Sequence, residues 1–87
     1  MKLILCPKCS DIVRLQNEKR YCMCKKSWGN YIDDLNAVIG GESVPLGIDN
    51  FSFVDAFRET KISDRKLGEE FIAFFIKLPC DSIKREN

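Results

Sequence analysis

Residues 6–24 read CPKCSDIVRLQNEKRYCMC and carry four of the five cysteines of this 87-residue chain. The cysteines form two close pairs, Cys6 with Cys9 and Cys22 with Cys24, and twelve residues separate the pairs. Paired thiols on short spacers, with enough chain between them for a hairpin, are what a tetrahedral zinc site with four thiolate ligands needs. The spacing predicts a zinc ribbon over residues 1–28, with zinc held as a structural cofactor by all four cysteines.

The two cysteine pairs differ in local geometry. Residues 6–9 have two residues between their cysteines, which allows a turn that points both sulfurs at one metal and leaves backbone N–H groups free to donate to the thiolates. Pro7 favours this turn because its φ is fixed. Residues 22–24 have one intervening residue, so their turn must be tighter than the first.

Three other states of these cysteines compete with zinc. Disulfides would strain the short loop of residues 22–24, and residues 1–5 are too short to be the hydrophobic core of a secretory signal. Reduced, inert cysteines would leave unexplained why four of the five fall within nineteen residues. Iron also binds at sites with four thiolates, and the sequence does not distinguish it from zinc.

The composition is that of a small folded protein. A chain of 87 residues makes one domain, near the size at which a hydrophobic core alone gives only a few kcal/mol of stability. The hydrophobic content of 45%, with six Phe, argues against disorder. No run approaches the roughly eighteen apolar residues of a membrane span. With reduced thiolates and no signal, this predicts a soluble, cytoplasmic protein without a membrane partner.

Charge is divided between the two parts of the chain. Residues 1–28 hold seven Lys or Arg against two acidic residues, and residues 29–87 hold seven basic against eleven acidic residues. The formal charges of the two parts are +5 and −4, which give the net charge of +1. Such an asymmetry can orient a partner.

The first part of the chain predicts a hairpin. Residues 1–5 are apolar and lead into the first cysteine pair as a strand. Residues 12–15 are rich in β-branched side chains, and residues 16–19 are polar and turn-prone. Residues 20–22 are expected to return as the second strand, which gives the hairpin that a ribbon places between its two metal-binding turns.

A second hairpin is predicted after the ribbon. Residues 31–39 alternate as a strand does. Gly40-Gly41 indicates a hairpin turn, with residues 42–48 as the partner strand. Pro45 lacks a backbone donor, so this strand is expected at an edge or with a bulge.

One short helix is predicted at residues 53–61. Three candidate N-caps precede it, namely Asp49, Asn50 and Ser52. One stripe of the helix would carry Phe53, Ala56 and Phe57. A helix of this length depends on packing for its stability.

The C-terminal region has two interpretations. Residues 62–78 show helical spacing of large apolar side chains, with Ser63 as a cap, yet residues 71–76 are apolar throughout and equally typical of a buried strand. The strand is favoured on composition. Residues 81–87 are polar and are expected to fray. Cys80 is expected to be a buried small hydrophobe, with a substitute metal ligand or an exposed thiol as alternatives.

These elements predict an α+β fold, mainly β. The N-terminal four-cysteine zinc ribbon is expected to pack on a small antiparallel sheet with one short helix. Residues 1–28 form the ribbon part, and residues 29–87 supply the β-hairpin, the short helix and a C-terminal strand of the same single domain. The oligomeric state is left open.

The region from the ribbon through the second hairpin resembles a type of small, uncharacterised bacterial and phage protein. In that type a zinc-binding turn is followed by a Gly-x-Tyr and a Gly-centred hairpin that ends near Gly-x-x-Asn. The matching residues are Cys6, Cys9, Cys22, Cys24, Gly29, Asn30, Tyr31, Gly40, Gly41, Leu46, Gly47, Ile48 and Asn50. The resemblance covers roughly the first fifty-five residues and brings no known activity. It implies a bacterial or viral source and a fused zinc-ribbon and sheet architecture.

Catalysis is not expected. The chain has no His, which removes the commonest general base. Zinc held by four cysteines has no open position for water or substrate. Asp33 and Asp34 are adjacent carboxylates, but neighbours on a strand face opposite sides, so they are expected to be a solvated surface.

Binding of nucleic acid is the predicted function. Basic and aromatic side chains flank the second cysteine pair, where they could contact phosphates and stack on bases. The expected contact residues are Arg20, Lys25, Lys26 and Trp28. Lys19 and Tyr21 lie among them in the sequence.

Two other functions compete with nucleic-acid binding. One is a protein-interaction module, for example a phage factor that docks on a host complex, with Phe51, Phe53 and Phe57 as candidate anchors. The other is a homo-oligomer that binds a small ligand near Gly40-Gly41 and Gly47, where the backbone can be approached closely. For both sets of residues, core packing and turn formation are the simpler interpretations.

Overall fold

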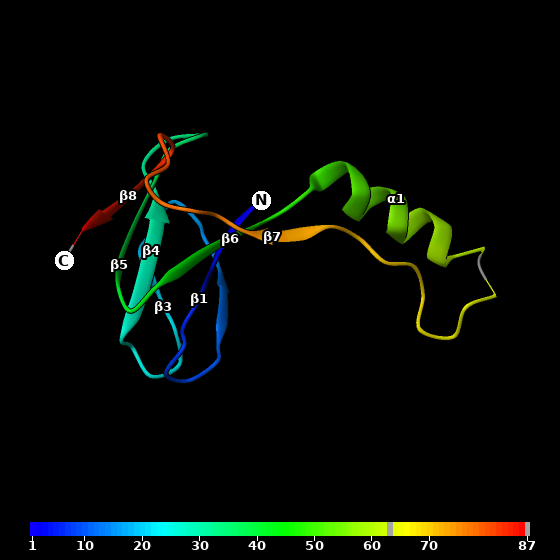
Figure 1. Ribbon diagram of the computed structural model, residues 1–87, viewed down its shortest axis with the longest axis horizontal. Coiled ribbons are helices and arrows are strands. Elements are labelled where there is room, and N and C mark those ends of the chain that lie inside the picture. Colours follow the sequence, from blue (N-terminus) through cyan, green and yellow to red (C-terminus); the bar gives the residue numbers. More distant parts are fainter. Residues whose placement is uncertain (63, 87) are drawn as a thin grey trace.

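Two four-stranded sheets and one helix make up the protein, which a computed structural model describes at residues 1–62 and 64–86 (Figure 1). In chain order the elements are β1 (Lys2–Leu5), β2 (Ile12–Arg14), β3 (Arg20–Tyr21), β4 (Ser27–Tyr31), β5 (Ala37–Gly41), β6 (Val44–Ile48), α1 (Asn50–Thr60), β7 (Ala73–Phe75) and β8 (Ile83–Glu86). The fold is α+β and mainly β, which confirms the predicted class.

Each sheet takes its strands from distant parts of the chain. One has the order β2-β1-β6-β7 and is called here the β1 sheet; the other has the order β3-β4-β5-β8 and is called the β5 sheet. Neighbouring strands are antiparallel except for β5 and β8, which are parallel. Because β1 pairs with β6 and β3 pairs with β4, strand pairing runs across the boundary drawn after residue 28.

The hairpin predicted between residues 12–15 and 20–22 is wrong. β2 pairs with β1, and β3 pairs with β4, so each cysteine pair has a hairpin of its own. Residues 16–19 do not close a turn between β2 and β3; they carry the chain from the β1 sheet to the β5 sheet. The apolar strand that precedes the first cysteine pair is the better partner for β2, since it is adjacent across the turn that the cysteines form.

A turn interrupts the strand predicted for residues 31–39. The Oδ1 atom of Asp33 accepts hydrogen bonds from the N–H of Leu35 at 2.9 Å and of Asn36 at 2.8 Å. Both carboxylate oxygens of Asp33 also accept from the Asn36 side-chain amide. A carboxylate that accepts from the backbone two and three residues ahead stabilises a turn. This local bonding outweighs the alternating pattern and separates β4 from β5.

Asp33→Ala is expected to lower the melting temperature, with a deficit that depends on pH. The Asn36 side chain, followed by the backbone N–H groups of Asn36 and Leu35, holds the pKa of Asp33 below its usual value of 3.8. A carboxyl whose pKa is lower in the folded state stabilises the fold above pH 3.8, and this contribution is lost as the pH falls through the folded value. Melting curves from about pH 7 to pH 2 should therefore converge in acid. A deficit independent of pH, or an equal one in the control Asp34→Ala, would contradict this account.

Gly40 and Gly41 do not close a hairpin, because β5 and β6 lie in different sheets. Gly41 has a φ of 66°, and a Cβ atom there would overlap the carbonyl oxygen of Lys26. The chain uses this position to leave the β5 sheet and enter the β1 sheet. The partner strand predicted at residues 42–48 does exist, as β6.

Pro45 lies in an inner strand, so the predicted edge position is wrong. β6 runs between β1 and β7, and Pro45 is opposite Ile4 of β1. The last pair between β6 and β7 joins Leu46 to Phe75, so the missing N–H of Pro45 falls beyond the end of β7. The carbonyl of Pro45 accepts from the Ile76 N–H at 3.0 Å.

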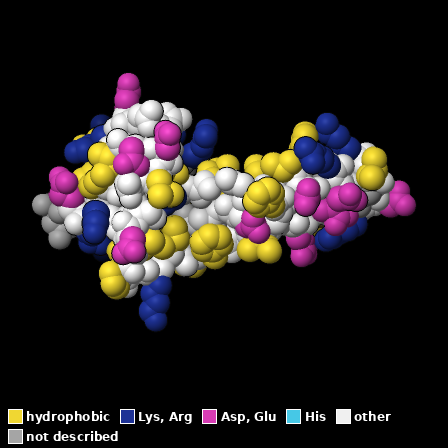
Figure 2. Space-filling model, turned by 90° about the horizontal axis from the view of Figure 1, so that it is seen from above, with side chains coloured by type: hydrophobic (Ala, Val, Ile, Leu, Met, Phe, Trp, Pro, Cys, Tyr) yellow, Lys and Arg dark blue, Asp and Glu magenta, His cyan; other side chains and the backbone are white. Residues whose placement is uncertain are grey.

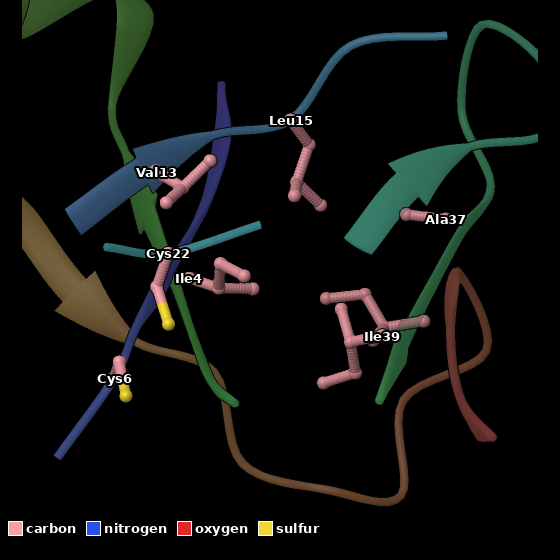
Figure 3. Packing of buried hydrophobic residues seen from close by; sticks show 8 residues of the cluster. Ile4, Cys6, Val13, Leu15, Cys22, Ala37 and Ile39 are labelled. Carbon is pink, nitrogen blue, oxygen red and sulfur yellow. The ribbon is translucent and has the colours of Figure 1, made fainter. Parts of the chain in front are cut away.

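One core lies between the two sheets and reaches the cysteines (Figure 3). Its buried members are Ile4, Cys6, Val13, Leu15, Cys22, Ala37, Ile39 and Ile83. Two of the four paired cysteines therefore belong to the core. Whatever the sulfurs bind is coupled directly to the packing of both sheets.

α1 and the chain that returns from it project from the sheets as an arm, defined here as residues 49–72 (Figure 1). The predicted helix is confirmed, although it starts at Asn50 instead of Phe53. Asp49 is the N-cap, and its carboxylate accepts from the N–H of Phe51 at 3.1 Å. Asp49 was one of the three predicted caps.

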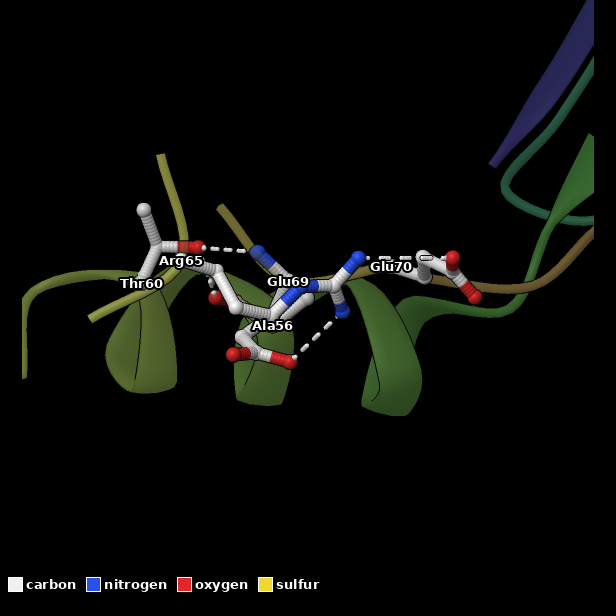
Figure 4. Close-up of polar contacts among 5 residues, drawn as sticks. All are labelled: Ala56, Thr60, Arg65, Glu69 and Glu70. Carbon is white, nitrogen blue, oxygen red and sulfur yellow. Dashed lines mark hydrogen bonds and ion pairs between the residues drawn. The ribbon is translucent and has the colours of Figure 1, made fainter. Parts of the chain in front are cut away.

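Two helix hydroxyls hold the returning chain of the arm, and Figure 4 shows one of these contacts, between Thr60 and Glu69. Ser52 Oγ accepts from the Ile72 N–H at 2.9 Å, and Thr60 Oγ1 accepts from the Glu69 N–H at 2.9 Å. Ser52, Ala56 and Thr60 share one face because helix residues four apart are neighbours. Ala56 is the buried residue of α1. The face of the helix toward the returning chain therefore carries small and hydroxyl-bearing residues, together with Phe53, whose ring centre lies 4.9 Å from that of Phe71. Phe51 and Phe57 are exposed.

Residues 64–78 contain the strand β7, so the favoured strand interpretation is confirmed over the described residues. Ser63, the cap expected for a helix, lies outside the described residues. The expected burial is wrong: Phe74 is 50% exposed and Phe75 is 65% exposed. β7 is the last strand of its sheet, and the described part of the chain places no further strand against it.

The polar C-terminal residues form β8, which corrects the expectation of a frayed tail. Ile83 is buried at 2% exposure and anchors the strand beside β5. The Arg85 guanidinium donates to the carbonyl of Gly41 at 3.0 Å and to the carbonyl of Ser43. These bonds hold β8 against the point where the chain changes sheets.

Candidate metal centre

The tips of two hairpins bring four sulfurs together. The turn between β1 and β2 carries Cys6 and Cys9, and the turn between β3 and β4 carries Cys22 and Cys24. Their four Sγ atoms all lie within 4.8 Å of one another. Cys6 and Cys22 are buried, Cys9 is partly buried and Cys24 is exposed. The cluster thus has two sulfurs on the core side and one open to solvent.

The distances match one coordination sphere. The Sγ atom of Cys24 lies 3.6 Å from that of Cys6 and 3.5 Å from that of Cys22. A tetrahedron with metal–sulfur bonds of about 2.3 Å has sulfurs about 3.8 Å apart. A disulfide bond is about 2.05 Å long, and all five cysteines are free thiols. The arrangement therefore suits a metal ion and not disulfide bonds.

Backbone bonds shape both turns. In the first, the Cys6 N–H donates to the Asp11 carbonyl at 2.9 Å. In the second, the Ser27 N–H donates to the sulfur of Cys22 at 3.3 Å. One side chain joins the two turns: the carboxylate of Asp11 accepts from the Met23 N–H at 2.9 Å. Asp11 does not stand out in the sequence, because its contact with Met23 depends on how the two hairpins meet.

Buried Ser27 stands next to the cluster. Its hydroxyl oxygen is buried, and among the described residues it has no hydrogen-bond partner of ordinary geometry. The hydroxyl is nevertheless the main influence that lowers the pKa of Cys6 to about 6, and the backbone N–H groups of Cys9 and Lys8 lower it further against the effect of burial. A thiolate at Cys6 would give this hydroxyl an acceptor, so the site fits an ionised sulfur.

The pKa values of Cys22 and Cys24 depend on the neighbouring sulfurs. Burial opposes ionisation of Cys22, but the Ser27 N–H and the Cys24 thiol outweigh it and lower the pKa of Cys22. The Lys26 N–H favours the Cys24 thiolate, yet partial desolvation of the sulfur and the three neighbouring sulfurs raise the pKa of Cys24 to about 12. Four crowded thiols cannot all ionise without a cation among them. A bound cation would remove this conflict, so the four cysteines could hold a metal ion.

Cys80 lies apart from the cluster, with its sulfur 3.5 Å from the Ser82 hydroxyl. It is partly buried against the core, close to the predicted small hydrophobe. The hydroxyl of Ser82, followed by its N–H, lowers the pKa of Cys80. The cysteine group within 4.8 Å over the described residues does not include it, so a role as a substitute ligand is not supported.

The residues predicted to contact nucleic acid lie on two faces of the second hairpin. Tyr21 and Trp28 are opposite each other on β3 and β4 and share a face, and the Lys19 ammonium lies 4.1 Å from the centre of the Trp28 ring. Arg20 points to the other face because side chains alternate along a strand, and its guanidinium donates to the Arg14 carbonyl at 3.0 Å. The structure thus joins Lys19 and Tyr21 to the predicted set and separates Arg20 from Trp28.

Lys25 and Lys26 are exposed on the turn that carries Cys24. Lys25 has a φ of 66°, and its N–H donates to the Cys22 carbonyl at 3.0 Å. A metal ion bound to Cys22 and Cys24 would fix this turn. It would therefore also fix the backbone positions from which the Lys25 and Lys26 side chains extend.

The remaining predicted residues have defined places. Side chains of the same chain fill the space at Gly40 and Gly47: the indole of Trp28 lies over Gly40 and the ring of Phe74 over Gly47. The candidate protein anchors lie on α1, where Phe51 is 86% exposed, Phe53 is 37% exposed and Phe57 is 60% exposed. The core does not explain these side chains.

A small, mainly β protein with a four-cysteine cluster at the tips of two hairpins belongs in the class of potential metal-binding proteins. Comparison of the chain with protein-family models, curated proteins and solved structures finds no match. Over residues 1–62 and 64–86, no helix is both long and apolar enough to cross a membrane.

Proposed function

We propose that the four cysteines bind one zinc ion as the structural centre of a zinc ribbon, and that the protein binds nucleic acid without catalysis. The observation that carries this proposal is the exposed basic and aromatic surface on the hairpin that the cysteines organise. Its residues are Lys19, Tyr21, Lys25, Lys26 and Trp28, called here the basic hairpin surface.

Zinc is favoured by the donor set. Four sulfurs within 4.8 Å of one another can supply a closed tetrahedral set of thiolate ligands, which is the usual structural zinc site. A closed set leaves no position for water or substrate, so the role of the metal is to hold the two hairpins together. Because Cys6 and Cys22 are also core residues, the metal supports the packing of both sheets.

Nucleic acid is favoured by the mixture of side chains on the basic hairpin surface. Lys25 and Lys26 can neutralise phosphates, and Tyr21 is 50% exposed and free to stack on a base. Trp28 covers Gly40 with one part of its indole and is partly exposed, so a base would displace the Lys19 ammonium to reach it. The same Lys19 could then contact the adjacent phosphate. Single-stranded nucleic acid suits this surface best, since its bases are available for stacking.

The double variant Lys25→Glu/Lys26→Glu is expected to weaken binding of a fluorescein-labelled 20-nucleotide RNA or DNA strand at least about tenfold at low salt. The slope of log affinity against log salt should fall by about 1.4, since each phosphate contact on a single strand contributes about 0.7. Fluorescence anisotropy over a salt series measures both quantities.

The matched control is Lys66→Glu/Lys84→Glu, which makes the same change of charge at exposed lysines away from the hairpin. It should retain most of the affinity and the original salt slope. Equal losses in the two variants would indicate general charge attraction, and no binding of the unmodified protein at low salt would end the nucleic-acid proposal.

A further inference from the structure

β7 forms a free edge of the β1 sheet. Within the described residues it pairs with β6 alone. The Ile72 carbonyl accepts from the Asp49 N–H at 2.9 Å, and the Ile76 N–H donates to the Pro45 carbonyl at 3.0 Å. Because successive residues of a strand direct their backbone groups to opposite edges, Ala73 directs its N–H and C=O away from β6.

The three residues of this edge strand include no charged residue and no proline. Exposed edge strands commonly carry lysine, proline or a bulge. Here the strand consists of Ala73, Phe74 and Phe75, and it continues from Phe71 and Ile72, which are 44% and 58% exposed. Figure 2 shows apolar side chains gathered where the arm leaves the sheets, with charged side chains toward the tip. The edge offers backbone hydrogen bonds and apolar side chains together.

The sequence of this edge is complementary to itself. Residues 69–77 read EEFIAFFIK, with Ala73 at the centre. In an antiparallel pair of two such segments centred on Ala73, Phe71 would lie opposite Phe75, and Ile72 opposite Phe74. The backbone N–H of Glu69 is bonded to Thr60 of the same chain, so Glu69 would contribute its side chain alone, which would lie near Lys77 of the other copy.

We propose that β7 pairs with β7 of a second copy of the chain, antiparallel about a two-fold axis at Ala73, so that the two β1 sheets join into one. A two-fold contact of this kind is closed, so it makes a dimer and leaves no further β7 edge. The paired edge contains none of the four clustered cysteines and is separate from the basic hairpin surface, which lies on the β5 sheet.

The side chains select this register. Side chains directly opposite each other in an antiparallel pair share a face and lie about 4.5–5.5 Å apart at Cβ. The proposed register therefore makes two aromatic pairs, each between Phe71 of one copy and Phe75 of the other. Alanine stands at the axis, where two identical side chains meet and a larger one would crowd. A shift by two residues would instead place Glu69 opposite Phe75, or Lys77 opposite Phe71.

Charge complementarity favours a second copy as the occupant. The two-fold axis brings Glu69 of each copy to Lys77 of the other, so both ends of the paired segment carry opposite charges. Arg65 already contacts Glu69 at 3.2 Å, so the carboxylate would lie between two cations. A parallel arrangement would bring like charges together at both ends.

The test is the mass of the intact, metal-loaded chain by sedimentation equilibrium or light scattering. One chain has a mass of 10.0 kDa, and we expect the doubled mass to appear as the concentration rises through about 1–100 µM. Ala73→Pro removes the outward N–H while leaving the bonds to β6 in place, and it should raise the dimer dissociation constant at least about tenfold. Ala73→Ser keeps the N–H and is the matched control, which should remain dimeric.

A charge exchange identifies the partner and the register. Lys77→Glu alone and Glu69→Lys alone each place like charges together at both ends of the pair and should dimerise more weakly. An equimolar mixture of the two variants places opposite charges at both ends, and it should recover the dimer. Circular dichroism and metal content confirm that each variant is folded.

Three results would overturn the proposal. The first is an unmodified chain with the mass of one copy up to about 1 mM, which would assign the edge to a different occupant. The second is a dimer that Ala73→Pro does not weaken. The third is a mixture of the two charge variants that associates no better than either variant alone.

Discussion

Cys22→Ser is expected to abolish stoichiometric metal binding and to unfold both sheets at room temperature. The substitution removes one of four thiolates and places a hydroxyl at a position with 3% exposure inside the core. Structural zinc contributes about 10–16 kcal/mol in small zinc-binding peptides. Small domains have total stabilities of about 5–15 kcal/mol. Loss of the metal is therefore of the same size as the whole stability.

Metal content by mass spectrometry of the native protein measures the first effect, and thermal unfolding followed by circular dichroism measures the second. Cys80→Ser is the control, because Cys80 is partly buried but lies outside the cluster. It should retain one metal ion and a melting temperature close to that of the unmodified protein. Full metal content in Cys22→Ser, or a melting curve of the unmodified protein that a chelator does not change, would show that the cysteines do not support the fold in this way.

Gly41→Ala is expected to destabilise the fold by about 2–4 kcal/mol. The φ of 66° costs alanine about 1–2 kcal/mol. The new Cβ atom would also overlap the backbone carbonyl of Lys26, which lies in the second cysteine turn and accepts a hydrogen bond from the Glu42 N–H at 2.9 Å. Denaturant unfolding with metal present measures the difference.

Gly68→Ala provides the comparison, because Gly68 also has a positive φ, of 77°. A Cβ atom added there would meet the side chain of Thr60 on the arm at 3.0 Å. We expect a loss of about 1–2 kcal/mol, from the backbone conformation alone. If both variants lost the same free energy of unfolding, the contact with Lys26 would make no contribution to the loss in Gly41→Ala. A reduced metal affinity in Gly41→Ala but not in Gly68→Ala would show in addition that the two sites are coupled.

The sequence predicted the features that depend on local spacing. The spacing within each cysteine pair is set by residues three and two apart in the chain, and the helix is set by a cap and its first turn. The strand at β7 followed from a short run of Phe and Ile. These features need no knowledge of which distant segments meet.

Strand pairing could not be predicted in the same way. Residues 12–15 suit two partners equally by composition, and the choice of β1 depends on how the first cysteine turn closes. The contacts of Asp33 with its own backbone outweigh an alternating pattern that otherwise predicts one strand. Gly40-Gly41 is typical of a hairpin turn, but β6, the strand that follows, pairs with β1 and β7 in the other sheet.

The same limit applies to the candidate surface for nucleic acid. Lys25 and Lys26 are fixed by the cysteine turn and were identified from the sequence. The grouping of Lys19 with Trp28, and the position of Arg20 on the opposite face, follow from the pairing of β3 with β4. The sequence alone does not separate these two faces of the hairpin, because it predicts residues 12–15, and not β4, as the partner of β3.

The arm begins and ends at almost the same place. The Asp49 N–H donates to the Ile72 carbonyl at 2.9 Å, so the two points where the arm leaves and re-enters the sheets are hydrogen-bonded to each other. A segment with adjacent ends can change in length or be replaced without a change in the distance that the rest of the chain must span. In evolutionary terms the arm is an exchangeable module: its tip can vary from one descendant to the next while the cysteines and both sheets stay where they are.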